Sequence, residues 1–159
     1  MMKDLQLKPK TWVVIADGEK ALFTVNRGDA EYPHLDVFRE EEQDNPPTRE
    51  QAANRPGRFN DGPNVHRSAV ADTDWHQLAK DRFAKELADI LYKKAHAGQF
   101  DEIVIAADPS TLGELRKELH STVTDRIVAE LDKDLTNHPL DKIEKMLAWQ
   151  RPDTFDRDL

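Results

Sequence analysis

The chain has 159 residues, a formal net charge of −8 and no cysteine. With 38% hydrophobic and 34% charged residues, it has no apolar run near the ~20 residues that a membrane-spanning helix needs. The lack of cysteine excludes disulfides and thiolate zinc sites. No apolar stretch of the kind found in signal peptides follows the first lysines, so we expect a cytoplasmic protein. The length of the chain fits a single domain over residues 1–159.

The first third of the chain predicts an antiparallel meander of three strands. Residues Thr11–Ala16 (TWVVIA) are β-branched and aromatic, and Asp17-Gly18 after them favours a type I′ hairpin turn. The second strand, Lys20–Asn26, ends at Arg27-Gly28-Asp29, which we interpret as a turn because glycine and aspartate are common turn residues. Leu35–Phe38 marks the third extended segment.

A polar stretch from about residue 40 to 74 follows the meander. Loops of this length without secondary structure are usually functional or disordered. Arg55, Arg58 and Arg67 place local positive charge in its second half, although the chain as a whole is acidic. Guanidinium groups bind phosphates and aromatic rings stack on bases, so the candidate binding surface consists of Arg55, Arg58, Phe59, Asn64, His66 and Arg67.

Residues 75–97 predict a long amphipathic helix. Asp74 is the expected N-cap with Gln77 reaching back to it, and Gly98 is the expected stop. The apolar face recurs at spacings of three and four residues. Its members are Leu78, Ala79, Phe83, Leu87, Ile90, Leu91 and Ala95.

The remainder predicts parallel crossovers. Residues 102–107 (EIVIAA) have the apolar character of a strand buried on both faces, and Asp108-Pro109-Ser110 starts a helix. Residues 125–135 fit a helix or a short strand, and we favour a strand because the preceding helix then crosses between parallel strands. His138-Pro139 opens a last helix, and the tail at about 150–159 is irregular.

This order of elements predicts an α/β fold with one mixed sheet. An antiparallel meander continued by parallel crossovers, flanked by helices, is the arrangement of ribonuclease-H-like domains. The architecture by itself does not decide function.

Four segments together cover nearly the whole chain: WVVIADGEKALFTVN, HRSAVADTDWHQLAKDRFAKELADIL, AADPSTLGELRKEL and TDRIVAELDKDLTNHPLDKIEKML. In these segments the chain resembles the bacterial host-attachment proteins. That family is named for a proposed requirement in bacterial attachment to host cells, and it is similar to the central domain of archaeal and eukaryotic peptide-chain release factors. The resemblance therefore implies a release-factor-like fold.

In those release factors, the loop between the third strand and the long helix carries Gly-Gly-Gln and helps to hydrolyse peptidyl-tRNA. This chain has no Gly-Gly-Gln, and Gln51 lacks paired glycines beside it, so we do not transfer the hydrolytic role. The resemblance still implies contact of the loop at about 40–74 with RNA, the ribosome or a protein partner. We expect a non-enzymatic binding protein without a cofactor.

Two other functions stay open at this point. A metal-dependent hydrolase of RNA or peptidyl-tRNA would need carboxylates as hard ligands, and Asp17, Glu86 and Asp108 are the candidates. Each also has a structural explanation, in a turn, on the polar face of a helix and at a helix cap respectively. A directly adhesive host-attachment protein is the second alternative, and it would require export.

Overall fold

The computed structural model describes residues 5–43 and 64–150, with side chains described for 5–43 and 75–150. The meander consists of β1 (Trp12–Ala16), β2 (Lys20–Asn26) and β3 (Leu35–Glu42). The long helix α2 (Asn64–His96) follows. The later elements are β4 (Ile103–Ala107), α3 (Pro109–Glu118), α4 (Ser121–Thr124), β5 (Ile127–Leu131) and α5 (Leu140–Leu147).

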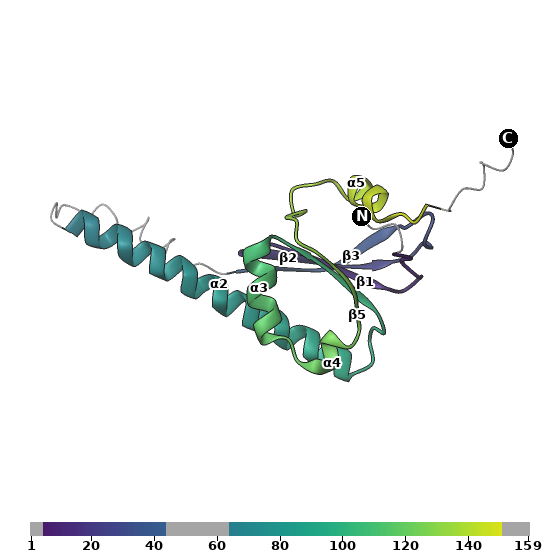
Figure 1. Ribbon diagram of the computed structural model, residues 1–159, viewed down its shortest axis with the longest axis horizontal. Helices are drawn as coiled ribbons and strands as arrows, with labels where there is room; N and C mark the ends of the chain where they lie inside the picture. Colours follow the sequence, from purple (N-terminus) through teal and green to yellow (C-terminus); the bar gives the residue numbers. More distant parts are fainter. Residues whose placement is uncertain (1–4, 44–63, 151–159) are drawn as a thin grey trace, which may run out of the picture.

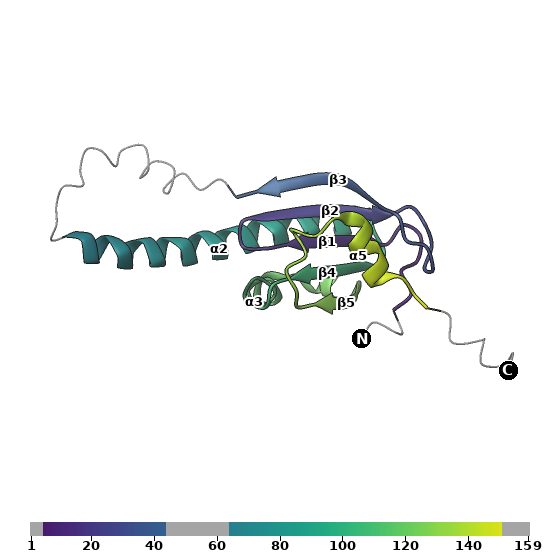
Figure 2. The ribbon, with the colours of Figure 1, turned by 90° about the horizontal axis from the view of Figure 1, so that it is seen from above.

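The five strands form one mixed sheet in the order β3-β2-β1-β4-β5 (Figures 1 and 2). β2 pairs antiparallel with both β1 and β3, whereas β4 pairs parallel with both β1 and β5. The predicted combination of a meander with parallel crossovers is therefore confirmed. The segment that fitted either a helix or a strand is the edge strand β5.

Helices cover both faces of the sheet. α2, α3 and α4 lie on one face and α5 lies on the other (Figure 1). Side chains of successive residues in β1 point alternately to the two faces of the sheet. Trp12 and Val14 belong to the core under α2 and α3. Val13 and Ile15 belong to the core under α5. All five residues of β1 and of β4 are buried, as expected of central strands.

Local signals in the sequence fix several element ends. Gly98 ends α2 with a φ of 73°, a left-handed conformation that favours glycine. Asp108 caps α3 by accepting a hydrogen bond from the Thr111 backbone N–H at 3.1 Å, and Pro109 occupies the first turn. These features are as predicted.

The turn between β1 and β2 differs from the type I′ prediction. A type I′ turn needs a positive φ at both central residues, and neither Asp17 nor Gly18 has one. Instead, Oδ1 of Asp17 accepts hydrogen bonds from the backbone N–H groups of Glu19 and Lys20 at 2.7 and 2.8 Å. The aspartate side chain therefore closes the turn, and positive φ angles are unnecessary.

The long helix starts earlier than predicted. α2 begins at Asn64 rather than Trp75, and β3 extends to Glu42, so helix and strand replace both ends of the predicted loop at 40–74. Gln77 does not reach back to cap the helix, because its Nε2 donates to Oδ1 of Asp81 one turn ahead. Residues 64–74 contain no glycine or proline, so the helix continues through Asp74 instead of beginning after it. The predicted tail beyond residue 150 lies outside the described residues.

Candidate functional site

The predicted binding residues divide between two parts of the chain. Asn64, His66 and Arg67 lie in the first turn of α2. Arg55, Arg58 and Phe59 lie outside the described residues. Figures 1 and 2 show that the N-terminal half of α2 extends well beyond the sheet, so the first turn of the helix lies far from the hydrophobic core.

The point where α2 leaves the sheet is marked by two contacts. Nε2 of Gln43, just after β3, donates to the backbone oxygen of Ala79 at 2.6 Å. The aliphatic part of Lys80 packs against Gly18, where an added Cβ would be 3.1 Å from two of its carbons. Beyond this point, towards its C-terminus, α2 buries Phe83 and Leu87 against the sheet.

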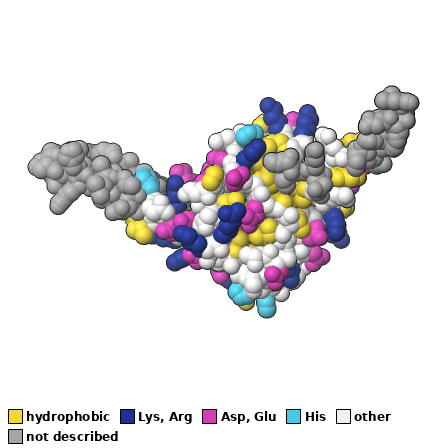
Figure 3. Space-filling view, viewed as in Figure 1, with side chains coloured by type: hydrophobic (Ala, Val, Ile, Leu, Met, Phe, Trp, Pro, Cys, Tyr) yellow, Lys and Arg dark blue, Asp and Glu magenta, His cyan; other side chains and the backbone are white. Residues whose placement is uncertain are grey.

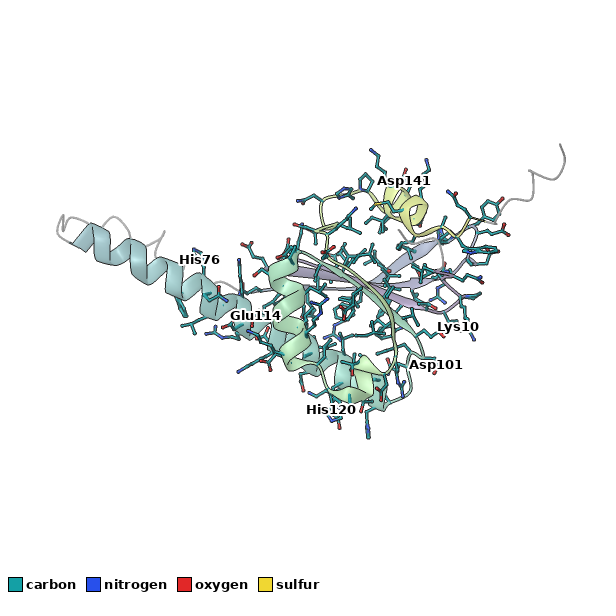
Figure 4. The ribbon with its side chains drawn as sticks, viewed as in Figure 1. Lys10, His76, Asp101, Glu114, His120 and Asp141 are labelled. Carbon is teal, nitrogen blue, oxygen red and sulfur yellow. The ribbon has the colours of Figure 1, made fainter. Side chains whose placement is uncertain are left out.

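An exposed apolar and cationic surface lies on α2 next to this point. Leu78 is 55% exposed, which corrects its predicted place on the buried face. The guanidinium carbon of Arg82 lies 5.7 Å from the centre of the Trp75 ring, within the range of a cation–π interaction. We call Trp75, Leu78 and Arg82 the α2 patch. Figure 4 shows its part of the helix near the labelled His76.

Sequence reasoning missed the α2 patch, although its spacing contains a signal. The buried positions Ala79, Phe83, Leu87 and Leu91 recur every fourth residue. Leu78 precedes that stripe by one position, and one residue turns an α-helix by about 100°. The predicted apolar face included Leu78 together with the buried stripe, although the two point in different directions around the helix.

The outward side of α2 carries charges of both signs. Arg82 and Lys85 are exposed there, and so are Glu86 and Asp89. Figure 3 likewise shows basic and acidic side chains interspersed where the helix joins the body of the protein. The described part of α2 is therefore not a uniformly basic surface.

The three candidate metal ligands do not form a metal site. Asp17 and Asp108 follow paired positions of the parallel strands β1 and β4, while the side chain of Glu86 is exposed on α2. Oδ2 of Asp17 accepts from the Thr136 hydroxyl at 3.1 Å, and Asp108 caps α3. Within residues 5–43 and 75–150, no group of three histidines or carboxylates is placed to hold a metal ion.

A cavity of about 450 Å³ opens at the other end of the central strands. Its lining combines Lys8 and Lys10 with Asp101 and Glu102, and Figure 4 labels Lys10 and Asp101 there. Lys8 pairs with Glu102 at 3.4 Å. Because the charges of the lining are balanced, this cavity does not select a ligand by its charge.

The mixed sheet and the long helix that follows its third strand define a release-factor-like α/β protein. Residues 10–147 match the model of bacterial archaeo-eukaryotic release factor family 12. The chain belongs to this family. The match includes the sheet and all the described helices up to the end of α5.

One relative is an uncharacterized protein of Rickettsia prowazekii (strain Madrid E). It is 33% identical over 76 residues, which cover 44% of this chain and 51% of the relative. The chain therefore spans about half the length of this curated relative. No helix among the described residues combines the length and apolar character needed to span a membrane.

Proposed function

We propose that this protein binds RNA, and through it the ribosome, with the chain that connects β3 to α2 and with the first turn of α2. The observation that supports this proposal is the position of Asn64, His66 and Arg67 at the start of a helix that extends beyond the sheet. Because the chain belongs to a release-factor family, we propose RNA and the ribosome as the target of this surface.

The residue types support a phosphate-rich partner. Arg55, Arg58 and Arg67 supply guanidinium groups, which bind phosphates with two parallel hydrogen bonds, and Phe59 supplies an aromatic ring that can stack on an unpaired base. Contacts with phosphates weaken as salt is raised, because the counterions released on binding gain less entropy when they enter a more concentrated salt solution. We therefore expect binding that depends strongly on ionic strength.

The proposed activity is binding without catalysis. The chain has no Gly-Gly-Gln, and the carboxylates of Asp17 and Asp108 serve the turn and the helix cap in the described structure. A role in attachment to host cells would then follow indirectly from binding inside the cell. Cell fractionation tests this location, and recovery of the protein at the cell surface would favour direct adhesion instead.

Charge reversal tests the binding surface. We expect Arg55→Glu, Arg58→Glu and Arg67→Glu together to abolish co-sedimentation with ribosomes and retention on RNA, while the circular dichroism spectrum stays unchanged. The matched control reverses three exposed lysines elsewhere, Lys93, Lys117 and Lys133, and should retain binding.

A second variant separates the connecting chain from the helix. Arg55→Glu with Arg58→Glu leaves α2 untouched, and we expect it to lose most of the binding. Binding of the triple variant at the wild-type level, or equal loss in the lysine control, would contradict the proposal. A protein partner recovered without RNA would contradict it as well.

A further inference from the structure

The α2 patch has the composition of a protein–protein contact. Trp75 is partly exposed under the Arg82 guanidinium, and Leu78 next to it is 55% exposed. Tryptophan and arginine are enriched among the residues that dominate binding energy at protein interfaces. The α2 patch has a bulky apolar centre between charged residues, so it is better suited to bind a protein surface than a phosphate backbone.

The charges around Leu78 follow a symmetric pattern along the helix. Asp74 and Arg82 lie four positions before and after Leu78, and Arg67 and Asp89 lie eleven positions before and after it. Four residues make about one helical turn and eleven make about three. All five positions therefore fall on one side of α2, where positive and negative residues alternate on passing from Arg67 to Asp89.

This alternation makes the helix complementary to a second copy of itself. If two α2 helices pair antiparallel about a two-fold axis at Leu78, each position faces the position equally far from Leu78 in the other copy. Arg82 then faces Asp74 and Asp89 faces Arg67, so every one of these contacts joins opposite charges. A parallel pairing would put like charges together, which is unfavourable.

The positions beside the central five are compatible with this pairing. Lys85 would face the small residue Ala71, and Asp81 would face Trp75. Asp81 already accepts a hydrogen bond from Gln77 of its own chain at 2.9 Å. Asp81 would also come near Asp74 of the second copy, where Lys85 supplies a compensating charge.

The described half of this surface is open to a partner. Arg82, Lys85 and Asp89 are exposed, and Asp89 is engaged by an exposed lysine, Lys93, at 3.1 Å. The segment from Arg67 to Asp89 is about 33 Å long at 1.5 Å per residue. In an antiparallel pair, the projecting half of each helix would lie along the exposed side of the packed half of the other.

We propose that this protein forms a two-fold symmetric dimer by antiparallel pairing of α2 about Leu78. The dimer brings the two predicted RNA-binding regions to opposite ends of the paired helices. The dimer contact with Asp89 and the proposed RNA-binding surface share Arg67. Dimerisation itself needs no RNA, so the mass of the protein in solution tests it separately.

Sedimentation velocity and light scattering over a wide range of protein concentration test the dimer. We expect the wild-type chain to be dimeric and Leu78→Glu to be monomeric with an unchanged circular dichroism spectrum, because the substitution places two carboxylates at the symmetry axis. Glu118→Arg on α3 changes charge away from the proposed interface and should remain dimeric. A monomeric wild-type protein, or a dimer that survives Leu78→Glu, overturns the proposal.

An exchange of charges tests the antiparallel register. Arg82→Asp and Asp74→Arg should each weaken dimerisation by about tenfold or more, since each places like charges opposite one another at two symmetric contacts. The double variant restores opposite charges and should regain most of the lost affinity. Weakening by both single variants without recovery in the double variant overturns this pairing.

Discussion

The two halves of α2 belong to one continuous helix but have different surroundings. From Ala79 to His96, the helix packs on the sheet and buries Phe83, Leu87 and Leu91. Before Ala79, it extends beyond the sheet and exposes Leu78 (Figure 2). Backbone hydrogen bonds within the helix make it continuous, whereas the neighbouring sheet decides which residues form a core. The packed half therefore supports the fold, and the projecting half is available for binding.

The largest expected effect separates the two halves by their contribution to stability. Leu87 is fully buried, so Leu87→Ala should lower the free energy of unfolding by about 2–5 kcal/mol. Leu78→Ala, the matched control, should change it by about 0.5 kcal/mol or less in the monomer because its side chain is largely in water. Urea unfolding measures both, and equal effects would contradict the comparison.

The C-terminal end of the packed half depends on a backbone conformation. Gly98 has a φ of 73° with no atom within 4 Å of an added Cβ, so Gly98→Ala should cost about 1–2 kcal/mol through backbone strain alone. Gly113 also has open space around it but lies inside α3. Gly113→Ala should therefore stabilise the protein, by about 0.4–1 kcal/mol. Thermal unfolding should show changes in Tm of opposite sign for the two variants. Destabilisation by both would contradict the attribution of the Gly98→Ala effect to its positive φ.

A smaller effect is expected where the helix leaves the sheet. Gln43→Ala removes the hydrogen bond to the Ala79 backbone oxygen and should cost about 0.5–1.5 kcal/mol. Gln43→Glu has nearly the same shape but no N–H donor, so it should be at least as destabilising. Wild-type stability in both variants would show that this contact does not hold the helix at the edge of the sheet.

The smallest effect concerns the α2 patch itself. The interaction of Arg82 with Trp75 at an exposed site should contribute about 0.5–1 kcal/mol. A double-mutant cycle with Arg82→Gln and Trp75→Leu, made in the monomeric Leu78→Glu variant, isolates it from dimerisation. A coupling energy indistinguishable from zero would mean that the two side chains are independent in the monomer.

Much of the fold was predictable because its signals are local. The β-branched runs, the cap at Asp108 and the stop at Gly98 act over a few residues, and the structure has each of them at its predicted place. The start of α2 was not predictable in this way. Asp74 can cap a helix or lie within one, and its sequence neighbours do not decide between these roles.

The candidate site was predictable in part. The sequence suggests Asn64, His66 and Arg67 as part of a binding surface, which stays a prediction, and it correctly offered structural explanations for Asp17 and Asp108. It did not reveal that Leu78 is exposed, because exposure depends on where the sheet ends. The β1–β2 turn is adjacent to α2 at Lys80, and no local pattern in the helix specifies that contact.

By itself, the sequence determined the types and order of the elements, the parallel and antiparallel halves of the sheet, and the alternating charges on either side of Leu78. These follow from the periodicity of strands and helices and from the conformational preferences of single residues. Only the tertiary structure decided where α2 leaves the sheet, and therefore which apolar residues are core and which form the α2 patch. The physical reason is that burial depends on neighbours distant in the chain, while helix formation depends on residues one turn away.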